Sequence, residues 1–351
     1  MDLYGKLPQY TSFASAFPND LAGWNVDRED QSQIAAFGEA TYLLPILKVT
    51  GGVRELRATT FHDFSTGDYF GEGVPSQTSA SNAYTATTPK LAISYEPTKD
   101  AMVYATASKG YRIGGYILPF PLNLGICPAS LAAYGIVNPK FSYIPDSLWS
   151  YELGGKTTWL DNHLSVNAST YYVDWSKVQQ TFVLSCGAPY TTNFGDAASY
   201  GGELEVQAKL LHAWTLGLEA SVTHATLTSV VPNVGATVGE HLLNVPAWTA
   251  TANAEYHWNV AGDSRIFVRG DYSWIGSSHG SYNVADPAYS YPNHSILNAS
   301  AGVTHSKFTV SLYAKNLLND QKIIQRVSIE TLETGYVPRP LTAGIKITAV
   351  F

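Results

Sequence analysis

The stretch WTATANAEYHW, residues 248–258, decides the fold, because its side chains alternate strictly between two kinds. In an extended strand one face would carry only Trp, Ala and Tyr, while the other would carry only Thr, Asn, Glu and His. Trp248 and Trp258 bound the apolar face, and their separation along a strand tilted by about 40° gives a height of about 25 Å. This height and these aromatic boundaries are typical of the apolar band of a transmembrane β-barrel.

The same two-residue period continues through most of the chain. It predicts about thirteen strands of roughly 10 to 17 residues, beginning near Gln31 and ending at Phe351. Short turns are expected near 161–162, 211–213, 261–263 and 305–306, and long segments at roughly 62–86, 118–146, 229–246, 277–295 and 318–339. Hairpins with one short-loop end and one long-loop end predict an all-β, antiparallel, up-and-down transmembrane β-barrel.

The composition agrees with a barrel and excludes other classes. Charged residues make up 14% of the 351 residues and tyrosine alone contributes 23, whereas soluble domains carry roughly 25% charged residues. A soluble sandwich is the alternative, but its solvated face would be rich in Lys and Glu and its strands would have about 5 to 6 residues. The net charge of -7 and the lack of any Lys/Arg cluster exclude nucleic acid as a partner.

The polar face of the predicted strands is the one that would line the lumen. Its charged side chains include Glu203, Glu205, Glu219, Glu255, Arg269 and Asp271. Small barrels fill their interior with packed side chains, so a lumen this polar has to be wide and to hold water or a separate plug. These charges could contact a plug or a passing substrate, or they could simply be solvated.

Six motifs, in their order along the chain, carry a resemblance to a known family. They are QIAAFGEATYLL from Gln33, VYATASKGYRIGGY from Val103, YELGGKTTWLDNHLSVNASTYYVDW from Tyr151, NFGDAASYGGELEVQAK from Asn193, LYAKNLLND from Leu312 and RPLTAGIKITAVF from Arg339. Together they resemble the barrel of a TonB-dependent outer-membrane receptor, a family with barrels of about 22 strands that imports siderophores, haem, cobalamin and some glycans. The resemblance covers residues 31–351, taken as a partial barrel domain, and leaves 1–30 as an outer-loop segment before the first complete strand.

The resemblance implies a receptor and transporter for a scarce nutrient, foremost a ferric siderophore, in the outer membrane of a Gram-negative bacterium. It implies no enzyme activity and no cofactor. The family's plug domain and TonB box are not found in this sequence, so we expect the C-terminal portion of the 22-stranded barrel without its plug. The TonB complex would then be a partner only if an N-terminal plug is present. A porin-like passive channel and a non-functional truncated receptor are the alternatives.

The final stretch LTAGIKITAVF, residues 341–351, ends in an aromatic residue after alternating apolar residues. The resemblance implies a signal for the barrel-assembly machinery, to which Ile345, Ile347 and Phe351 would contribute. An ordinary last strand would show the same pattern. In either case the apolar face of the strand would contact outer-membrane lipid.

The chain has two cysteines, Cys127 and Cys186, and both fall in segments expected to be outer loops. An oxidising cell surface permits a disulfide that would join these neighbouring loops. Two free thiols are the alternative.

Two further patterns suggest chemistry only weakly. GSSHG, residues 276–280, fits the nucleophile-elbow pattern around Ser278, but that chemistry needs a helix directly after the turn, and a turn-rich segment follows instead. His62, Asp63 and His279 would lie in outer loops and could touch a metal chelate, but the nine histidines show no metal-ligand spacing. We therefore expect solvated loop histidines and no hydrolase.

Overall fold

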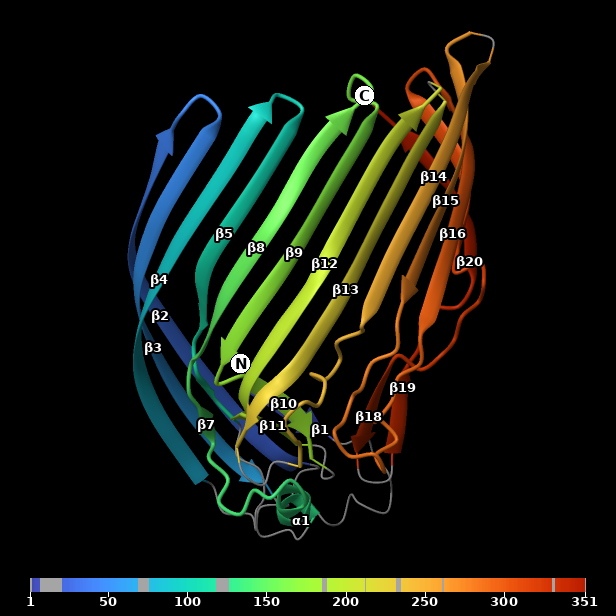
Figure 1. Ribbon diagram of the computed structural model, residues 1–351. Helices are drawn as coiled ribbons and strands as arrows, with labels where there is room; N and C mark the ends of the chain where they lie inside the picture. Colours follow the sequence, from blue (N-terminus) through green and yellow to red (C-terminus); the bar gives the residue numbers. More distant parts are fainter. Residues whose placement is uncertain are drawn as a thin grey trace, which may run out of the picture.

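The computed structural model describes residues 2–6, 21–68, 76–117, 126–184, 188–211, 213–231, 235–260, 262–329 and 332–350. Most of them belong to one antiparallel sheet whose strands follow the order of the chain (Figure 1). The strands of this sheet are β1 (Asp2–Lys6), β2 (Leu21–Leu43), β3 (Leu47–Asp68), β4 (Ser76–Thr98), β5 (Ala101–Arg112), β8 (Asp146–Trp159), β9 (Leu164–Ser176), β12 (Gly195–Leu210), β13 (Trp214–Val230), β14 (Trp248–Val260), β15 (Ser264–Ile275), β16 (His294–His305), β17 (Phe308–Lys315) and β20 (Thr342–Ala349).

Smaller elements lie in the connections at one end of the sheet, which we name the loop end (Figure 1, bottom). They are the strand pairs β6 (Gly115–Tyr116) with β7 (Ser142–Tyr143), β10 (Gln179–Val183) with β11 (Pro189–Asn193) and β18 (Gln325–Ile329) with β19 (Leu332–Tyr336), and the helix α1 (Ile126–Ala133). The opposite end, named the turn end, carries the short connections between strands (Figure 1, top). The predicted loop asymmetry is therefore confirmed.

The predicted strand number is confirmed as well. In the described ranges the sheet has, beyond the five-residue β1, thirteen strands from β2 to β20. The short turns also lie where the sequence predicts them, with left-handed backbone at Asp161, Leu211, Gly262 and Ser306. Such positive φ values match tight hairpin turns to the right-handed twist of the flanking strands.

Two predicted boundaries are wrong. β2 begins at Leu21 rather than near Gln31, and β3 and β4 extend through most of the segment 62–86 that the pattern assigns to a loop. Thr, Ser and Asn are frequent on both faces of these extensions, so the hydropathy period fades although Thr and Phe still favour strands. The three strands consequently reach 23, 22 and 23 residues, and the expected loop segment 1–30 contains β1 and part of β2.

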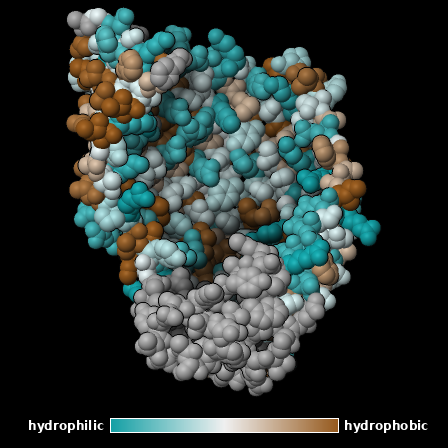
Figure 2. All heavy atoms as spheres, turned by 180° about the vertical axis from the view of Figure 1, so that it is seen from behind, coloured by the Kyte–Doolittle hydropathy of each residue, from teal (hydrophilic) through white to brown (hydrophobic). Residues whose placement is uncertain are grey.

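The sheet is curved into an open trough. Within the described residues β1 lies at one edge and β20 at the other, with no pairing between them. Figure 2, seen from behind, shows the hollowed face of the trough, which is mostly hydrophilic, and hydrophobic side chains gathered along its flanks. Large apolar side chains such as Leu153, Leu218 and Leu312 are exposed on the opposite, convex face. Because soluble monomers rarely leave so much contiguous apolar surface in water, the convex face suits lipid.

The buried core lies mainly at the loop end and not in the middle of the wall. One cluster of buried residues consists of Val178, Phe194, Ala197, Ala225, Leu227 and Leu242. A second consists of Ile117, Leu131, Leu184 and Tyr190, and Leu131 belongs to α1. Connections that are far apart in the chain therefore pack together into a cap on the loop end.

The connection after β17 is ordered by the motif NLLND, which begins at Asn316. The buried side chain of Asn316 donates hydrogen bonds to the carbonyl oxygens of Asp320 and Arg339 and accepts one from the Asp320 N–H. The Asp320 carboxylate accepts hydrogen bonds from the backbone N–H groups of Lys322 and Ser295. These donors lower the pKa of Asp320, because they stabilise its charged form. The motif thus connects β16, β17 and the segment that leads into β20.

We expect Asn316→Ala to lower the free energy of unfolding by roughly 1–3 kcal/mol, because it leaves buried backbone groups without their partners. Urea unfolding of the detergent-solubilised chain measures this loss. The control is Asn259→Ala, an exposed residue of β14, which should change the free energy little. Equal losses in the two variants would contradict the role of the motif.

Candidate functional site

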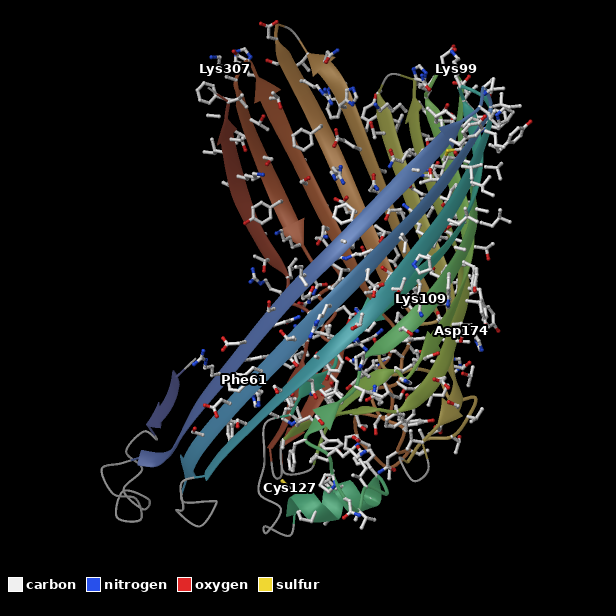
Figure 3. All side chains as sticks on the ribbon, turned by 90° about the vertical axis from the view of Figure 1, so that its left-hand side faces the viewer. Phe61, Lys99, Lys109, Cys127, Asp174 and Lys307 are labelled. Carbon is white, nitrogen blue, oxygen red and sulfur yellow. The ribbon has the colours of Figure 1, made fainter. Side chains whose placement is uncertain are left out.

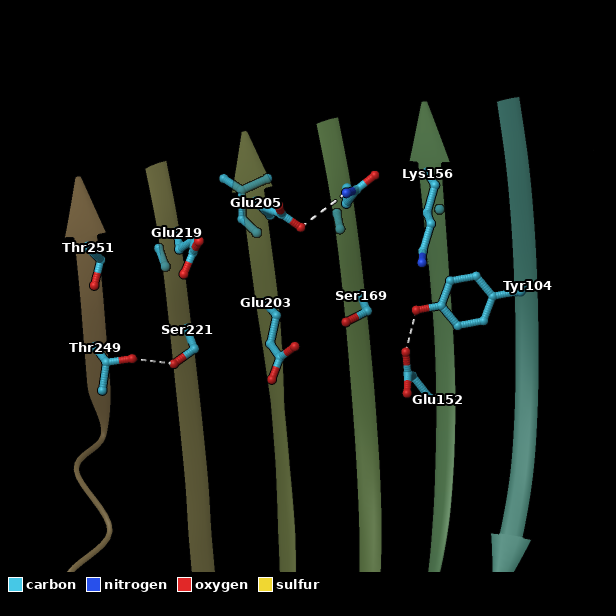
Figure 4. Close-up of a pocket in the computed structure, with 15 residues that line it drawn as sticks. Tyr104, Glu152, Lys156, Ser169, Glu203, Glu205, Glu219, Ser221, Thr249 and Thr251 are labelled. Carbon is cyan, nitrogen blue, oxygen red and sulfur yellow. Dashed lines mark hydrogen bonds between the residues drawn. The ribbon is translucent and has the colours of Figure 1, made fainter. Parts of the chain in front are cut away.

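A hollow of about 570 Å³ lies on the concave face of the trough and is lined from β5 across to β14 (Figure 4). The register arranges its polar side chains in two adjacent rows across the strands. One row contains Tyr104, Ser169, Glu203, Ser221 and Thr249, and the other contains Lys156, Asn167, Glu205, Glu219 and Thr251. All of them belong to the polar half of the two-residue period, so the alternation itself aims them at the lumen.

The hollow is negatively charged, because four of its lining residues are glutamates and one is a lysine. Glu205 and Glu219 stand directly opposite each other on neighbouring strands, an arrangement of like charges that destabilises a sheet. Asn167 and Gln207 donate hydrogen bonds to Glu205 at 3.1 and 2.7 Å. In the described part of the chain, Glu203 and Glu219 make no side-chain hydrogen bond or ion pair. The site therefore suits a cationic group of a partner or a ligand.

Tyr104, Glu152 and Lys156 are among the residues of the hollow that the sequence does not single out. The Tyr104 hydroxyl donates a hydrogen bond to Glu152, and the Lys156 ammonium lies 5.9 Å from the centroid of the Tyr104 ring (Figure 4). Their only signal in the sequence is that they occupy the polar face of two of the motif strands. Pairing across β5 and β8, which the sequence does not reveal, brings them together.

The remaining predicted lumen charges form a separate group on β14 and β15. Arg269 donates a hydrogen bond to Asp271 at 2.6 Å and lies 3.6 Å from Glu255. Arg265 lies 3.7 Å from the same glutamate. The predicted charged row is thus divided into an acidic part in the hollow and an ion-paired part beside it.

His62 and Asp63 lie on β3 and not in an outer loop, which corrects the prediction. His62 is buried, and its ring stacks on Tyr116 with 5.3 Å between the centroids. Tyr116 belongs to β6, so the connection between β5 and β8 folds onto the inner face of β3. The aromatic contact is not visible in the sequence, because the two residues are distant along the chain.

The structure does not support a hydrolase site at Ser278 or a metal site at His279. The backbone of Ser278 pairs with Tyr291, and turns rather than a helix follow at 279–293. The Nδ1 atom of His279 lies 3.0 Å from the carbonyl oxygen of Tyr289. No group of three or more His, Cys, Asp or Glu side chains in the described residues could hold a metal ion. The same residues include no helix with the length and apolarity needed to cross a membrane.

Only part of the predicted disulfide is described. Cys127 lies in α1, is 4% exposed and is disulfide-bonded. Cys186 lies outside the described residues, so its role as the partner stays a prediction. Cys127 is buried in the helix that also supplies Leu131 to the second cluster, which agrees with a role in joining the connections of the cap.

The predicted assembly signal is also described only in part. Ile345 and Ile347 are 67% and 71% exposed on β20, on the face that suits lipid. Phe351 lies outside the described residues. Recognition of these three residues by the assembly machinery stays a prediction.

We expect Glu219→Gln to raise the free energy of unfolding of the detergent-solubilised chain by roughly 0.2–1 kcal/mol, because it removes the repulsion with Glu205. Glu255→Gln should lower it, since Glu255 is paired with Arg265 and Arg269. Urea unfolding at low salt measures both, and added salt should shrink the difference. A loss of stability in Glu219→Gln would rule out the repulsion.

The two cysteines should be joined in the mature protein. The unfolded wild-type chain should react with a maleimide only after reduction, and mass spectrometry should find the Cys127 and Cys186 peptides linked. Cys127→Ser should expose one reactive thiol without reduction. Two reactive thiols in the unreduced wild-type chain would refute the bond.

Comparison with known proteins agrees with this geometry. The family model described as TonB dependent receptor-like, beta-barrel matches residues 2–317. The ferric yersiniabactin uptake receptor FyuA from Yersinia pestis matches with a TM-score of 0.76 and 18% identity, over 94% of this chain and 47% of that chain. The closed form of the ferric-catecholate import receptor Fiu from E. coli K12 gives 0.67 and 17%, over 92% and 45%.

The copper transporter OprC matches in the same way, with a TM-score of 0.64 and 16% identity over 96% of this chain and 50% of that chain. The chain spans about half the length of these solved structures. Identities this low show a shared fold and leave the ligand open. The family model, however, covers most of the sequence, and the chain therefore belongs to the family of TonB-dependent receptor-like β-barrels.

Proposed function

We propose that the protein takes up a ferric siderophore across the outer membrane of a Gram-negative bacterium, and that this chain supplies the wall and the ligand-gathering loops. The observation that carries the proposal is the packed, aromatic-rich cap above a polar lumen. FyuA and Fiu are named for ferric siderophores, which supports this class of ligand. Since the chain spans about half of each, uptake would be a property of the whole receptor.

The buried aromatic side chains of the cap would hold in place the loops that meet an organic iron chelate. Tyr190 is buried in the second cluster, and its hydroxyl bonds the backbone of Lys140. Phe194 and Tyr282 stack with 5.4 Å between centroids in the first cluster. Aromatic rings held rigidly in this way give neighbouring loops the fixed shape that stacking and hydrogen bonding to a ligand require.

In the same transporter, the acidic hollow would bind a cationic partner inside the lumen. Glu203 and Glu219 face the lumen with no ion pair among the described residues, so cationic side chains of a plug or a cationic part of the substrate would neutralise them. The TonB complex would be a partner through such a plug. The barrel-assembly machinery would read the last strand, and no step of this function needs covalent chemistry or a cofactor.

A titration of the purified, detergent-solubilised chain with ferric siderophores tests the proposal. Tryptophan fluorescence should be quenched saturably by one chemical class among catecholate, hydroxamate and carboxylate complexes, with a Kd on the order of 1 μM or tighter. Phe194→Ala, which opens the first cluster, should weaken binding, while the distant Asn259→Ala should not. Quenching that never saturates, or that is equal for a ferric complex of EDTA, would refute siderophore recognition.

A passive channel is the second candidate, favoured by the mostly hydrophilic concave face of the trough (Figure 2). It predicts steady ion conductance when the purified chain is added to planar bilayers. The transporter predicts no steady conductance from the whole receptor, because a plug would fill the lumen. Stable open channels from the whole receptor would therefore favour the porin-like function.

A further inference from the structure

The wall opens between β4 and β5 on the side of the loop end. The two strands pair only from Lys90 to Thr98 on β4, and the rest of β4 pairs with β3 alone. Pro89 stands where the pairing with β5 stops, and a proline has no N–H with which to continue a ladder. In Figure 3 the long strands β2, β3 and β4 cross the front of the molecule obliquely, away from the strands behind them.

A second hollow, of about 310 Å³, lies at this opening. The residues that matter for its chemistry are Thr85, Thr87, Lys109, Tyr111, Ser147 and Lys177. Two are lysines and the other four carry hydroxyl groups. The hydroxyl oxygen of Tyr111 is buried and has no hydrogen-bond partner. This set of ammonium and hydroxyl donors suits an anion with several acceptor oxygens, such as a phosphate.

The hollow lies at the depth of lipid headgroups. Lys109 stands opposite Trp149 in the register, and Trp149 stacks on Tyr151, which contacts Tyr172, at centroid distances of 6.1 and 6.5 Å. Such aromatic rows mark the boundary of the apolar band of a membrane barrel. On the turn-end side of this row the convex face is apolar and exposed, as at Val103, whereas the hollow lies on its loop-end side.

The two lysines of the hollow are not engaged by the carboxylates around it. Neither lysine makes a side-chain hydrogen bond or an ion pair with another described residue. Asp146, which also lines the hollow, is 3% exposed and is paired with Arg112, and it accepts a hydrogen bond from the Gln179 N–H. Glu55 accepts a hydrogen bond from Thr87.

Two further carboxylates lie nearby. Asp196 accepts hydrogen bonds from the Lys177 N–H at 2.8 Å and from the Ser229 hydroxyl at 2.7 Å. Asp174 is exposed. In the register, Trp149 of β8 lies between Lys109 of β5 and Asp174 of β9. Asp174 forms no ion pair with either lysine in the described part of the chain. The side chains of the two lysines are therefore available to an anionic ligand without breaking an ion pair in the described part of the chain.

We propose that this hollow binds the phosphate-bearing headgroup of an outer-leaflet lipid. Lys109 and Lys177 would neutralise the phosphate, and the hydroxyl groups of Thr85, Tyr111 and Ser147 would donate hydrogen bonds to its oxygens. The acyl chains would run along the apolar convex face that begins at the aromatic row. This continuity with the lipid-facing surface selects a lipid over a free phosphate ion. A bound lipid would also fill the opening that the missing β4–β5 pairing leaves in the wall.

Native mass spectrometry of the detergent-solubilised chain tests the site, with phosphatidic acid as the probe and phosphatidylcholine as the reference lipid. The double variant Lys109→Gln, Lys177→Gln should bind phosphatidic acid at least about tenfold more weakly. The matched control is Lys99→Gln, Lys307→Gln, which removes two exposed lysines at the turn end (Figure 3, top). The control should bind phosphatidic acid like the wild type.

The charge-retaining variant Lys109→Arg, Lys177→Arg should keep the binding, and circular dichroism should show the same strand content in all variants. Equal weakening in the test and control pairs would overturn the proposal, as would equal retention of the two lipids by the wild type. An excess of inorganic phosphate should not displace phosphatidic acid. Displacement by inorganic phosphate would show an anion site without lipid recognition and would also overturn it.

Discussion

Each long strand of this sheet obeys one constraint: a backbone surrounded by lipid has to satisfy its N–H and C=O groups within the protein. Most of the strands from β2 to β20 meet it by pairing on both sides with their neighbours in chain order. The loop-end part of β4 and the edge strand β20 pair on one side among the described residues. Once the ladder is formed, the two-residue period sends alternate side chains to opposite faces. The apolar convex face and the acidic hollow are therefore two consequences of the same hydrogen-bonded ladder. A register shift of one residue would move the apolar side chains of a strand to the lumen and its polar side chains to the lipid.

The same constraint also determines which part of the protein is closely packed. The wall exposes its apolar side chains, so close packing is found mainly at the loop end, where Phe194, Leu131 and Leu184 are at most 1% exposed. The lumen instead carries opposed like charges at Glu205 and Glu219. Such an arrangement costs stability in the isolated wall and favours a cationic partner in the lumen, which agrees with the proposed transporter.

The sequence predicts the wall better than the site. Strict alternation at 248–258 and at the terminal stretch predicts the strands, and the turn residues predict the short connections. The loop boundary at residue 62 is wrong, because Thr and Ser occupy both faces of β3 and remove the hydropathy signal while preserving strand propensity. Tyr104 and Glu152 are missed, because their hydrogen bond depends on the pairing of β5 with β8. The stacking of His62 on Tyr116 is missed for the same reason, since a long connection has to fold back.

The most direct test of the account compares two adjacent positions of β13 in a lipid bilayer. Nitroxide labels at Leu218 and at Glu219, in a chain whose two cysteines are replaced by serine, report contact with oxygen dissolved in lipid and with a nickel chelate dissolved in water. The account predicts that the label at 218 is relaxed mainly by oxygen and the label at 219 mainly by the nickel chelate. The same response at both positions would contradict a wall with one face in lipid and the other in an aqueous lumen.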